Sequence, residues 1–318
     1  MTIVSDDISK AVTFLCNNDV VAIPTETVYG LAGNIYSEAA IRRIFEVKQR
    51  PLLNPLIVHL HDTEQIEEIV SEYPKEAQLL AEHFWPGPLT LILKKKAVIP
   101  DLITAEKDTV AVRIPNHPVT LRLLKALPFP IAAPSANPFN RISPTQSSHV
   151  AEYFKDKIPM VLEGGECQRG IESTIVGFEN HSPVIYRLGS ISVEDIEKVI
   201  GHIEVKNKND EAPSAPGMLA KHYAPRTKTL LVDDVESFLS DYQGLSVGVL
   251  TFTRELKAEG IKHTEILSKK GDLQEAAANL YSALHKLDQL DLDMIVAERF
   301  PDIGLGKSIN DRLERASK

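Results

Sequence analysis

Cysteine is almost absent from this sequence of 318 residues, which carries only Cys16 and Cys167. Two cysteines are too few for a disulfide scaffold or a thiolate zinc site, and they suit a reducing compartment. The sequence also lacks an apolar run of the roughly 18 to 20 residues that cross a bilayer. Residues 1–7 are acidic where a secretion signal would be basic and then apolar. We therefore predict no membrane association and a cytoplasmic location.

An excess of positive charge is missing as well. Lys and Arg total 35 against 44 Asp and Glu, which gives a formal net charge of −9. Nonspecific affinity for nucleic acid comes from clustered Lys and Arg, so this balance argues against an extended phosphate-contacting surface. Any contact with nucleic acid is expected to be local or indirect.

The length of the chain predicts two hydrophobic cores, because single cores stop growing near about 250 to 300 residues. Short β-branched runs alternate with helical patterns over residues 1–205, and strands outnumber helices there. This favours a twisted, mixed α/β sheet. Residues 206–228 are rich in charge and proline and are typical of a linker. Residues 229–318 predict a small Rossmann-like or flavodoxin-like unit.

Hydrophobic periodicity predicts the elements. Ser5 is the expected N-cap of a first helix, and Ser37 that of a second helix ending near Lys48. In the first domain, strands are expected at residues 20–23, 56–60, 89–93, 109–114, 130–133, 160–162, 173–178 and 184–187. In the second domain, we expect strands at 229–232, 247–251 and 292–297, a helix over about 271–287, and a last helix up to Ala316.

The densest signal for a site is the segment Lys48–Leu56, KQRPLLNPL. Pro51 biases Arg50 away from helical geometry, so Lys48 and Arg50 are able to turn toward a common point beyond the helix. Two cations there would suit a polyphosphate. Taken alone, the pair is better explained as two solvated charges at a helix C-terminus, where the dipole favours cations.

Two polar loops each follow a predicted strand. In Pro24–Gly30, PTETVYG, the hydroxyls of Thr25, Thr27 and Tyr29 share one side of an extended chain. Ligands of α/β sheets commonly lie beyond the carboxyl ends of strands. In the second loop, Ala133–Pro138, prolines restrict the backbone and are able to aim Ser135 and Asn137 the same way. Taken alone, each loop also fits an ordinary turn.

Two further strands carry candidate ligands for a carboxylate or phosphate. His59 and His61 share a strand face, but no Cys or nearby carboxylate completes a zinc ligand set, so we predict no metal site there. For His59, a contact with a substrate carboxylate is a simpler explanation than a zinc site. Thr109 and Arg113 share one face of another strand, where a guanidinium is able to bind an oxyanion bidentately.

Together these segments follow one order across nearly the whole chain. The runs PTETVYGL, KQRPLLNPL, WPGPLTLIL, VAVRIP, APSAN, ESTIV and YRLG resemble the YrdC-type domain. The runs SAPGMLAKHYAPR and GLGKSINDRLERA resemble the extension of the Sua5 branch. The chain thus resembles the YrdC/Sua5 family, which implies a YrdC-like twisted mixed sheet domain followed by a small Rossmann-like Sua5 domain.

The resemblance assigns site residues by their places in the motifs. It implies a catalytic set of Lys48, Arg50, Ser135 and Asn137. It implies L-threonine contacts from Thr27, His59, Arg113, Ala133 and Ser173. It implies ATP contacts from Arg50, Asn54, Thr109, Ser135, Ser143, Arg187 and Tyr223. Tyr223 would then cover the nucleotide and make the linker a lid, although a passive connector fits the sequence as well.

The activity implied by the resemblance is synthesis of L-threonylcarbamoyl-AMP, diphosphate and water from L-threonine, bicarbonate and ATP, with Mg2+ accompanying the ATP. The product would pass to a threonylcarbamoyl transferase complex that modifies adenosine 37 of tRNAs reading ANN codons, and a weak direct contact with tRNA is possible in that scheme. Two positions depart from the family pattern: Leu219–Ala220 replace a common Lys-Tyr, and Asn140 replaces a common glycine.

Two alternatives stay open at this point. The first is an RNA-binding module whose basic face would comprise Arg42, Arg43, Lys48, Arg50 and Lys94–Lys96. The second is carbamoyl-adenylate formation for another acceptor, as in hydrogenase-maturation proteins, which contain additional zinc-finger and acylphosphatase parts that this sequence does not show.

Overall fold

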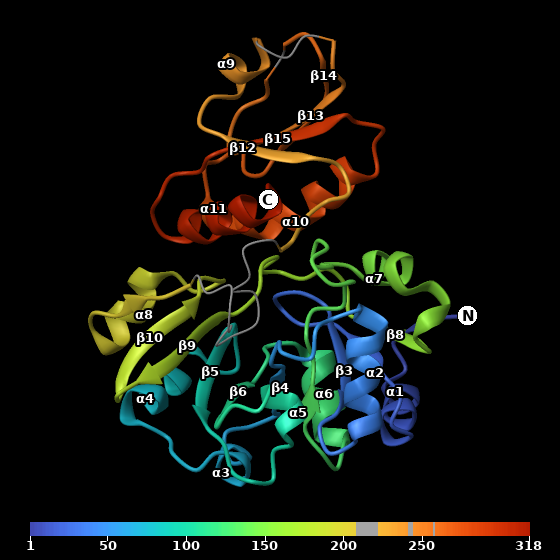
Figure 1. Ribbon diagram of the computed structural model, residues 1–318, viewed down its shortest axis with the longest axis vertical. Helices are drawn as coiled ribbons and strands as arrows, with labels where there is room; N and C mark the ends of the chain where they lie inside the picture. Colours follow the sequence, from blue (N-terminus) through green and yellow to red (C-terminus); the bar gives the residue numbers. More distant parts are fainter. Residues whose placement is uncertain (208–221, 241–243, 257) are drawn as a thin grey trace.

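The computed structural model describes residues 1–207, 222–240, 244–256 and 258–318 (Figure 1). Within them, 11 strands form one sheet in the first domain, and four strands form a second sheet. Much of the predicted linker, including Leu219 and Ala220, lies outside the described residues. Across the described part of the chain, every helix is too short or too polar to cross a bilayer.

The first domain is a large mixed sheet with helices packed on it. Its strands are β1 (Ile3–Ser5), β2 (Val21–Ile23), β3 (Gly30–Asn34), β4 (Ile57–His59), β5 (Leu89–Lys94), β6 (Thr109–Arg113), β7 (Ile131–Ala132), β8 (Met160–Leu162), β9 (Thr174–Glu179), β10 (Ser182–Arg187) and β11 (Glu204–Val205). Its helices are α1 (Ile8–Cys16), α2 (Glu38–Lys48), α3 (Ile66–Ile69), α4 (Lys75–Phe84), α5 (Asp101–Thr104), α6 (Pro118–Ala126), α7 (Ser147–Phe154) and α8 (Val193–Ile200), with a 3₁₀ turn at Lys155–Lys157.

The strand order is β1-β8-β2-β3-β7-β4-β6-β5-β9-β10-β11. Parallel pairs such as β4 with β6 alternate with antiparallel pairs such as β5 with β6. The predicted mixed sheet is therefore confirmed. The prediction missed β3, because its sequence GLAGN has neither β-branched residues nor an alternating pattern.

Helix caps confirm one prediction and correct another. Ser37 caps α2 as predicted, and its side chain accepts from the backbone N–H of Ala40 at 3.2 Å. The predicted cap of α1 at Ser5 is wrong, because Ser5 ends strand β1 and Asp7 accepts from the N–H of Lys10 at 3.0 Å. Asp is as good an N-cap as Ser, and α1 begins after Asp7 instead of Ser5.

The second domain is a small parallel sheet with helices on both faces. Its strands β12 (Thr229–Val232), β13 (Val247–Thr251), β14 (Ile261–Ile266) and β15 (Met294–Glu298) run in the order β12-β15-β13-β14, with every pair parallel. Its helices are α9 (Val235–Ser240), α10 (Leu273–Asp288) and α11 (Leu305–Ala316). The Rossmann-like prediction is confirmed, although the polar strand β14 was missed.

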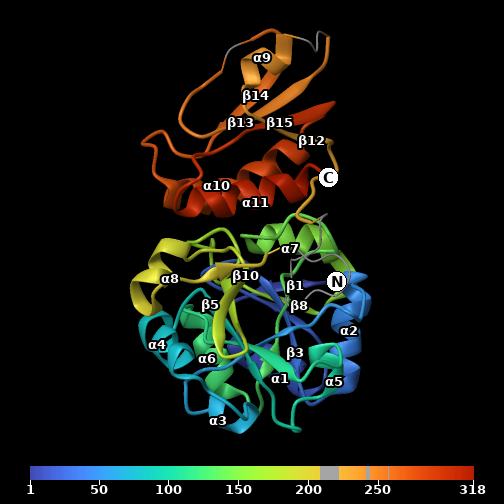
Figure 2. The same cartoon turned by 60° about the vertical axis from the view of Figure 1, so that its left-hand side comes forward.

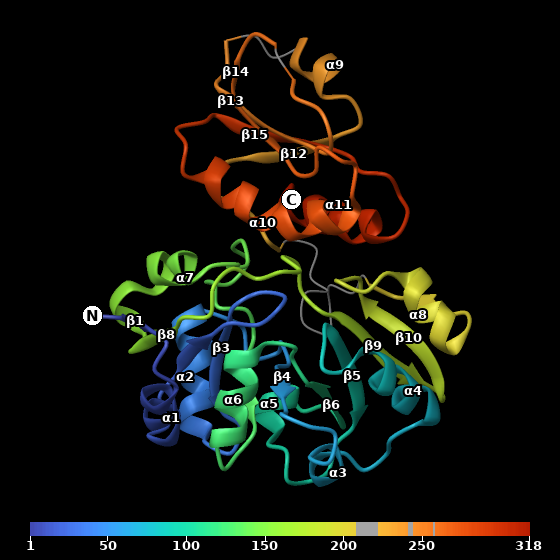
Figure 3. The same cartoon turned by 180° about the vertical axis from the view of Figure 1, so that it is seen from behind.

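Helices α10 and α11 lie side by side between the small sheet and the first domain (Figures 1 and 3). Figure 2 shows the same arrangement from the side, with α9 on the far face of the small sheet. The two domains therefore meet through these helices, and the polar loops of the first domain lie beneath them.

Candidate active site

A small cavity in the first domain collects most of the predicted site residues. Its lining comprises Thr25, Thr27, Val28, Gly30, Arg50, Ile57, His59, Arg113, Ala133, Pro134, Ser135, Glu172, Arg187, His222 and Tyr223. These residues come from the loops that follow β2, α2 and β7 and the loop that precedes β9, from β4, from the ends of β6 and β10, and from the chain that enters the second domain. The cavity measures about 40 Å³, which is room for only a few water molecules.

The end of α2 turns two cations into the protein. Helix α2 ends at Lys48, and Gln49 adopts a left-handed conformation with φ of 54°. This turn leaves Lys48 and Arg50 only 1% and 8% exposed, so the explanation as solvated charges is wrong. The Lys48 Nζ donates to the carbonyl oxygens of Ser135 and Asn137, each at 2.5 Å. The predicted proximity of Lys48 to this loop is therefore confirmed.

Burial lowers the pKa of both cations. Burial first, and then repulsion from Arg50, lowers the pKa of Lys48 well below its usual value. Burial and the nearby Arg187 lower the pKa of Arg50 to about 10. Arg187 donates through Nη2 to both the carbonyl and the hydroxyl of Ser173 at 2.9 Å. Like charges held together without solvent favour a polyanion between them.

Arg113, which lines the same cavity, belongs to a buried ion pair. Arg113 Nη2 donates to Glu26 Oε1 at 2.7 Å and to Thr27 Oγ1 at 3.0 Å, and both ionic side chains are nearly inaccessible. The Thr27 hydroxyl also contacts that of Thr25 at 2.8 Å. Sequence reasoning missed Glu26, whose position between the two threonines was the available signal. This arrangement fixes the orientation of the Arg113 guanidinium.

His59 lines the cavity as a neutral imidazole. Its Nδ1 lies 3.2 Å from the carbonyl oxygen of Ile57. Burial first, and then the charge of Arg113, lowers its pKa to about 3. A neutral ring is able to offer one hydrogen bond without adding charge. His61 lies apart from the cavity and contacts Asp62 at 2.5 Å.

Six predicted residues are absent from the cavity lining, namely Lys48, Asn54, Thr109, Asn137, Ser143 and Ser173. Thr109 begins β6, four residues before Arg113, and lines a separate hollow together with Ile92 and Phe178. Ser143 is fully buried and donates to Glu172 Oε1 at 2.6 Å. The Ser173 hydroxyl contacts that of Thr90 at 2.7 Å. Lys48 lies behind the loop whose carbonyls it binds.

Several buried polar atoms around the cavity have no hydrogen-bond partner within the described residues. They are Arg50 Nε, Asn54 Oδ1, Asn137 Oδ1, His222 Nδ1 and the Tyr223 hydroxyl. Native proteins rarely leave such atoms unsatisfied, so each one indicates a group that joins the site from outside. Donors and acceptors both occur in this set, as a ligand with phosphate and hydroxyl groups requires.

Comparison with known families agrees with this geometry. The family described as "Telomere recombination", Sua5_yciO_yrdC, matches residues 13–189. The family described as "Threonylcarbamoyl-AMP synthase, C-terminal domain", Sua5_C, matches residues 191–318. This chain belongs to the YrdC/Sua5 family.

Relatives of this Sua5-type chain match it from end to end. A threonylcarbamoyl-AMP synthase of Pyrococcus abyssi is 41% identical, covering 96% of this chain and 93% of the relative. That of Bacillus subtilis is 40% identical, covering 98% and 92%. The crystal structure of P. abyssi Sua5 complexed with L-threonine superposes with a TM-score of 0.92 at 40% identity, covering 99% of this chain and 98% of that one.

The basic face required by the RNA-binding alternative does not form. Lys48 and Arg50 are buried, and the other predicted contributors outside Lys96 each form an ion pair with a nearby carboxylate, namely Arg42, Arg43, Lys94 and Lys95. Lys96 donates to the carbonyl of Glu67. Charges neutralised in this way do not provide the clustered positive potential that phosphate backbones need.

The Sua5 domain contributes to the site from its helices, which sequence reasoning did not foresee. Glu172 accepts hydrogen bonds from Tyr281 of α10 and from Arg312 of α11, each at 2.9 Å. Both donors lie more than 100 residues along the chain from Glu172. The available signal was the concentration of polar residues at Asn310, Asp311 and Arg312, which α11 buries.

Proposed function

We propose that this protein is a threonylcarbamoyl-AMP synthase that converts L-threonine, bicarbonate and ATP into L-threonylcarbamoyl-AMP, diphosphate and water. The observation that carries the proposal is one cavity whose lining brings together Arg50, Arg113 and Arg187 with Thr27. Full-length relatives that carry the name of this activity support it.

Threonine fits beside the Arg113 pair. A guanidinium binds a carboxylate with well-defined geometry, and Thr27, His59 and Ala133 line the same part of the cavity. Ser173 would act through its neighbours, since its hydroxyl is held by Thr90 and Arg187. The solved complex of the P. abyssi relative with L-threonine supports this choice of amino acid.

ATP fits along Arg50, Ser135 and Arg187. Its phosphates would satisfy the unpartnered Arg50 Nε, and Asn54 lies in the loop that follows. Ser143 would reach the nucleotide only by leaving its contact with Glu172. We expect a role for Thr109 only if the nucleotide extends into the neighbouring hollow that this residue lines.

The reaction needs positioning and charge stabilisation more than covalent catalysis. The amine of threonine takes up bicarbonate with loss of water to give a carbamate. A carbamate oxygen then attacks the α-phosphorus of ATP, and the bond to the bridging oxygen breaks so that diphosphate leaves. Arg50 and Arg187 would stabilise charge on the phosphates. Lys48 would hold the Ser135–Asn137 loop in position through its two hydrogen bonds.

The donor set fits Mg2+ that arrives bound to ATP. Mg2+ prefers oxygen ligands and usually keeps substrate phosphates and water among them. The unpartnered Oδ1 atoms of Asn54 and Asn137 are the buried oxygens that would hold it. When bound, Mg2+ would neutralise charge on the phosphates. The described residues contain no cluster of three His, Cys, Asp or Glu side chains suited to a resident metal.

The cavity must open before two substrates enter, because its volume of about 40 Å³ is far below the roughly 300 to 1,000 Å³ of ordinary ligand sites. His222 and Tyr223 line it and precede the second domain, so movement of this segment is the simplest route. Closure would then exclude water from the product, a labile mixed anhydride. That product would pass to a threonylcarbamoyl transferase complex acting on tRNA.

Diphosphate release tests the proposal directly. Purified full-length protein should release diphosphate only when ATP, bicarbonate and L-threonine are all present, and omission of any one should abolish release. Mg2+ should be required, and chelation should stop the reaction. Release that does not depend on threonine would contradict the proposal, and the use of another carbamoyl acceptor would support the second alternative.

A further inference from the structure

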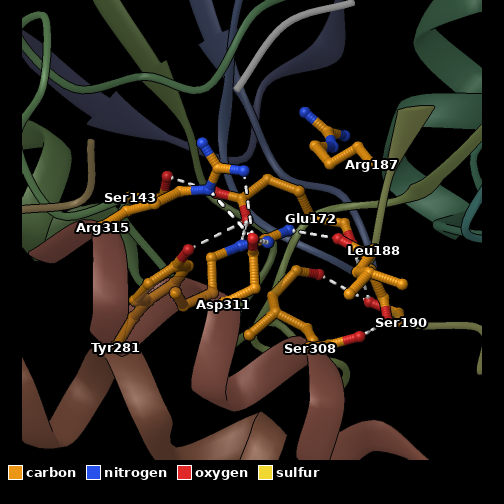
Figure 4. A network of polar contacts seen from close by, with 12 residues as sticks. Ser143, Glu172, Arg187, Leu188, Ser190, Tyr281, Ser308, Asp311 and Arg315 are labelled. Atoms are coloured by element: carbon orange, nitrogen blue, oxygen red, sulfur yellow. Dashed lines mark hydrogen bonds and ion pairs between the residues drawn. The ribbon is translucent and has the colours of Figure 1, made fainter. Parts of the chain in front are cut away.

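A buried polar network joins the Sua5 domain to the wall of the cavity (Figure 4). At its centre is Arg312 of α11, which is 0% exposed. Its Nε donates to Glu172 Oε2 at 2.9 Å, its Nη1 to Asp311 Oδ2 at 2.7 Å, and its Nη2 to the carbonyl oxygen of Leu188 at 2.7 Å. All three nitrogens therefore serve this network, and the first one reaches a residue that lines the cavity.

Glu172 is a carboxylate on the cavity wall. It is 5% exposed and accepts from Ser143 at Oε1 and from Tyr281 and Arg312 at Oε2. Burial alone would raise its pKa, but Arg312, Arg187 and the Ser143 hydroxyl together lower it to about 2. The group is therefore negatively charged at neutral pH, directly beside the cations proposed to bind the phosphates.

An unneutralised carboxylate at this position would oppose nucleotide binding. Charges within a dry cavity wall are poorly screened, so a lone Glu172 would repel the phosphates and compete for Arg187. The first domain supplies Arg187, which also lowers the pKa of Glu172 but donates its hydrogen bonds to Ser173. The cation bonded directly to the Glu172 carboxylate is Arg312, from the second domain.

Arg312 also lies against the side chain that covers the cavity. Its guanidinium carbon is 4.8 Å from the centroid of the Tyr223 ring, within the range of cation–π attraction. Tyr223 lines the cavity. One arginine side chain thus contacts both the acidic wall and the aromatic cover.

We propose that Arg312 is a positioning residue for ATP: by neutralising Glu172 and supporting Tyr223, it keeps the nucleotide side of the cavity cationic. Arg312 itself touches no substrate. This inference rests on the proposed function and deepens it, because it makes the Sua5 domain a part of the nucleotide site. It assigns to that domain an electrostatic role in addition to that of a lid.

The test compares the Michaelis constants for ATP and threonine in three variants of the full-length protein. Arg312→Met leaves Glu172 unneutralised, so the KM for ATP should rise about tenfold or more, as is usual when one partner of a buried charge pair is lost. The KM for threonine should change much less. Glu172→Gln/Arg312→Met removes both charges and should return the KM for ATP close to that of Glu172→Gln.

A matched control is Arg299→Met, which removes an arginine of the same domain that is half exposed and paired with Glu314 and Asp233. Its KM for ATP should equal that of the unaltered protein. Equal increases in both Michaelis constants in Arg312→Met, or no rescue in the double variant, would overturn the proposal. A purely structural role of Arg312 would change the Michaelis constants for both substrates and not that for ATP alone.

Two further measurements test the inference if Arg312→Met does not fold or if the protein shows no turnover. If Arg312→Met does not fold, the double variant still tests it, because no unpaired charge is buried there; a weak affinity for ATP in a folded double variant would contradict the proposal. Calorimetric titration with Mg-ATP measures nucleotide affinity without turnover. The role of Arg312 is therefore tested even if the unaltered protein releases no diphosphate.

Discussion

The residues proposed to bind the substrates of this protein include charged side chains removed from water. Lys48, Arg50, Arg113 and Arg187 are each at most 8% exposed. Burying a charge is costly unless it is paired or meets a ligand. Arg113 is paired with Glu26, whereas Arg50 has a buried Nε without a partner in the described chain. The unsatisfied Nε of Arg50 therefore supports its proposed place in a phosphate subsite.

Replacement of either cation at the end of α2 should abolish most turnover. Arg50→Ala removes a charge proposed to face the phosphates, and Lys48→Ala releases the two carbonyls that Lys48 binds. Each variant should lose roughly 100-fold or more in kcat, the usual cost of deleting such a group. Diphosphate release under saturating substrates measures this loss.

Arg42→Ala is the matched control for these two variants. Its side chain is 58% exposed and pairs with Glu38 on the surface of the same helix, and such pairs contribute little to stability. Its kcat should be unchanged. Near-normal turnover in Arg50→Ala would remove Arg50 from the site, whereas a decrease of equal size in Arg42→Ala would indicate general damage to α2.

At the scale of elements, local rules predicted most strands, but among the described helices they predicted only α1, α2, α10 and α11. They also failed where the sequence offers two similar signals. Ser5 and Asp7 both satisfy the preference for an N-cap, and only the pairing of β1 with β8 decides between them, because it holds Ser5 in a strand. Strand β3 was missed since Gly30–Asn34 owes its strand conformation to β2 and β7 on either side. Long-range pairing of this kind leaves no local pattern.

The cap of α1 gives a stability test at this scale. Asp7→Ala removes the side chain that accepts from the N–H of Lys10 and should lower the free energy of unfolding by about 1 kcal/mol. The matched control is Asp6→Ala, which removes an equal charge one residue earlier. Chemical denaturation monitored by circular dichroism measures both. Equal effects of the two substitutions would show that charge, and not capping, is what matters.

At the scale of the whole molecule, the sequence predicted both domains but not the contacts between them. The motifs that identified the site lie in the first domain and in the chain that leaves it, near Tyr223. The contribution of Tyr281 and Arg312 depends on how α10 and α11 dock above Glu172. Docking of one domain on another is a property of tertiary structure, and no spacing within the sequence encodes it.

The same interface buries a histidine pair that should make stability depend on pH. His149 of α7 and His285 of α10 stack with ring centroids 3.8 Å apart. Burial, followed by the neighbouring His149, lowers the pKa of His285 to about 3, and burial lowers that of His149. Between about pH 3 and 6.5 the unfolded chain binds a proton at His285 that the folded protein does not, so stability must fall as the pH falls through this range.

His285→Gln removes this titration and should flatten the acid side of the stability profile. The slope for one histidine is about 1.4 kcal/mol per pH unit below pH 6.5. Denaturation midpoints of the variant and the unaltered protein, measured from pH 8 to pH 5, check it. At pH 8 the imidazole is neutral in both states, so a difference there reports only the lost packing and the lost contact with the Ser143 carbonyl. Parallel profiles at acid pH would mean that the interface opens and hydrates His285 before the protein unfolds.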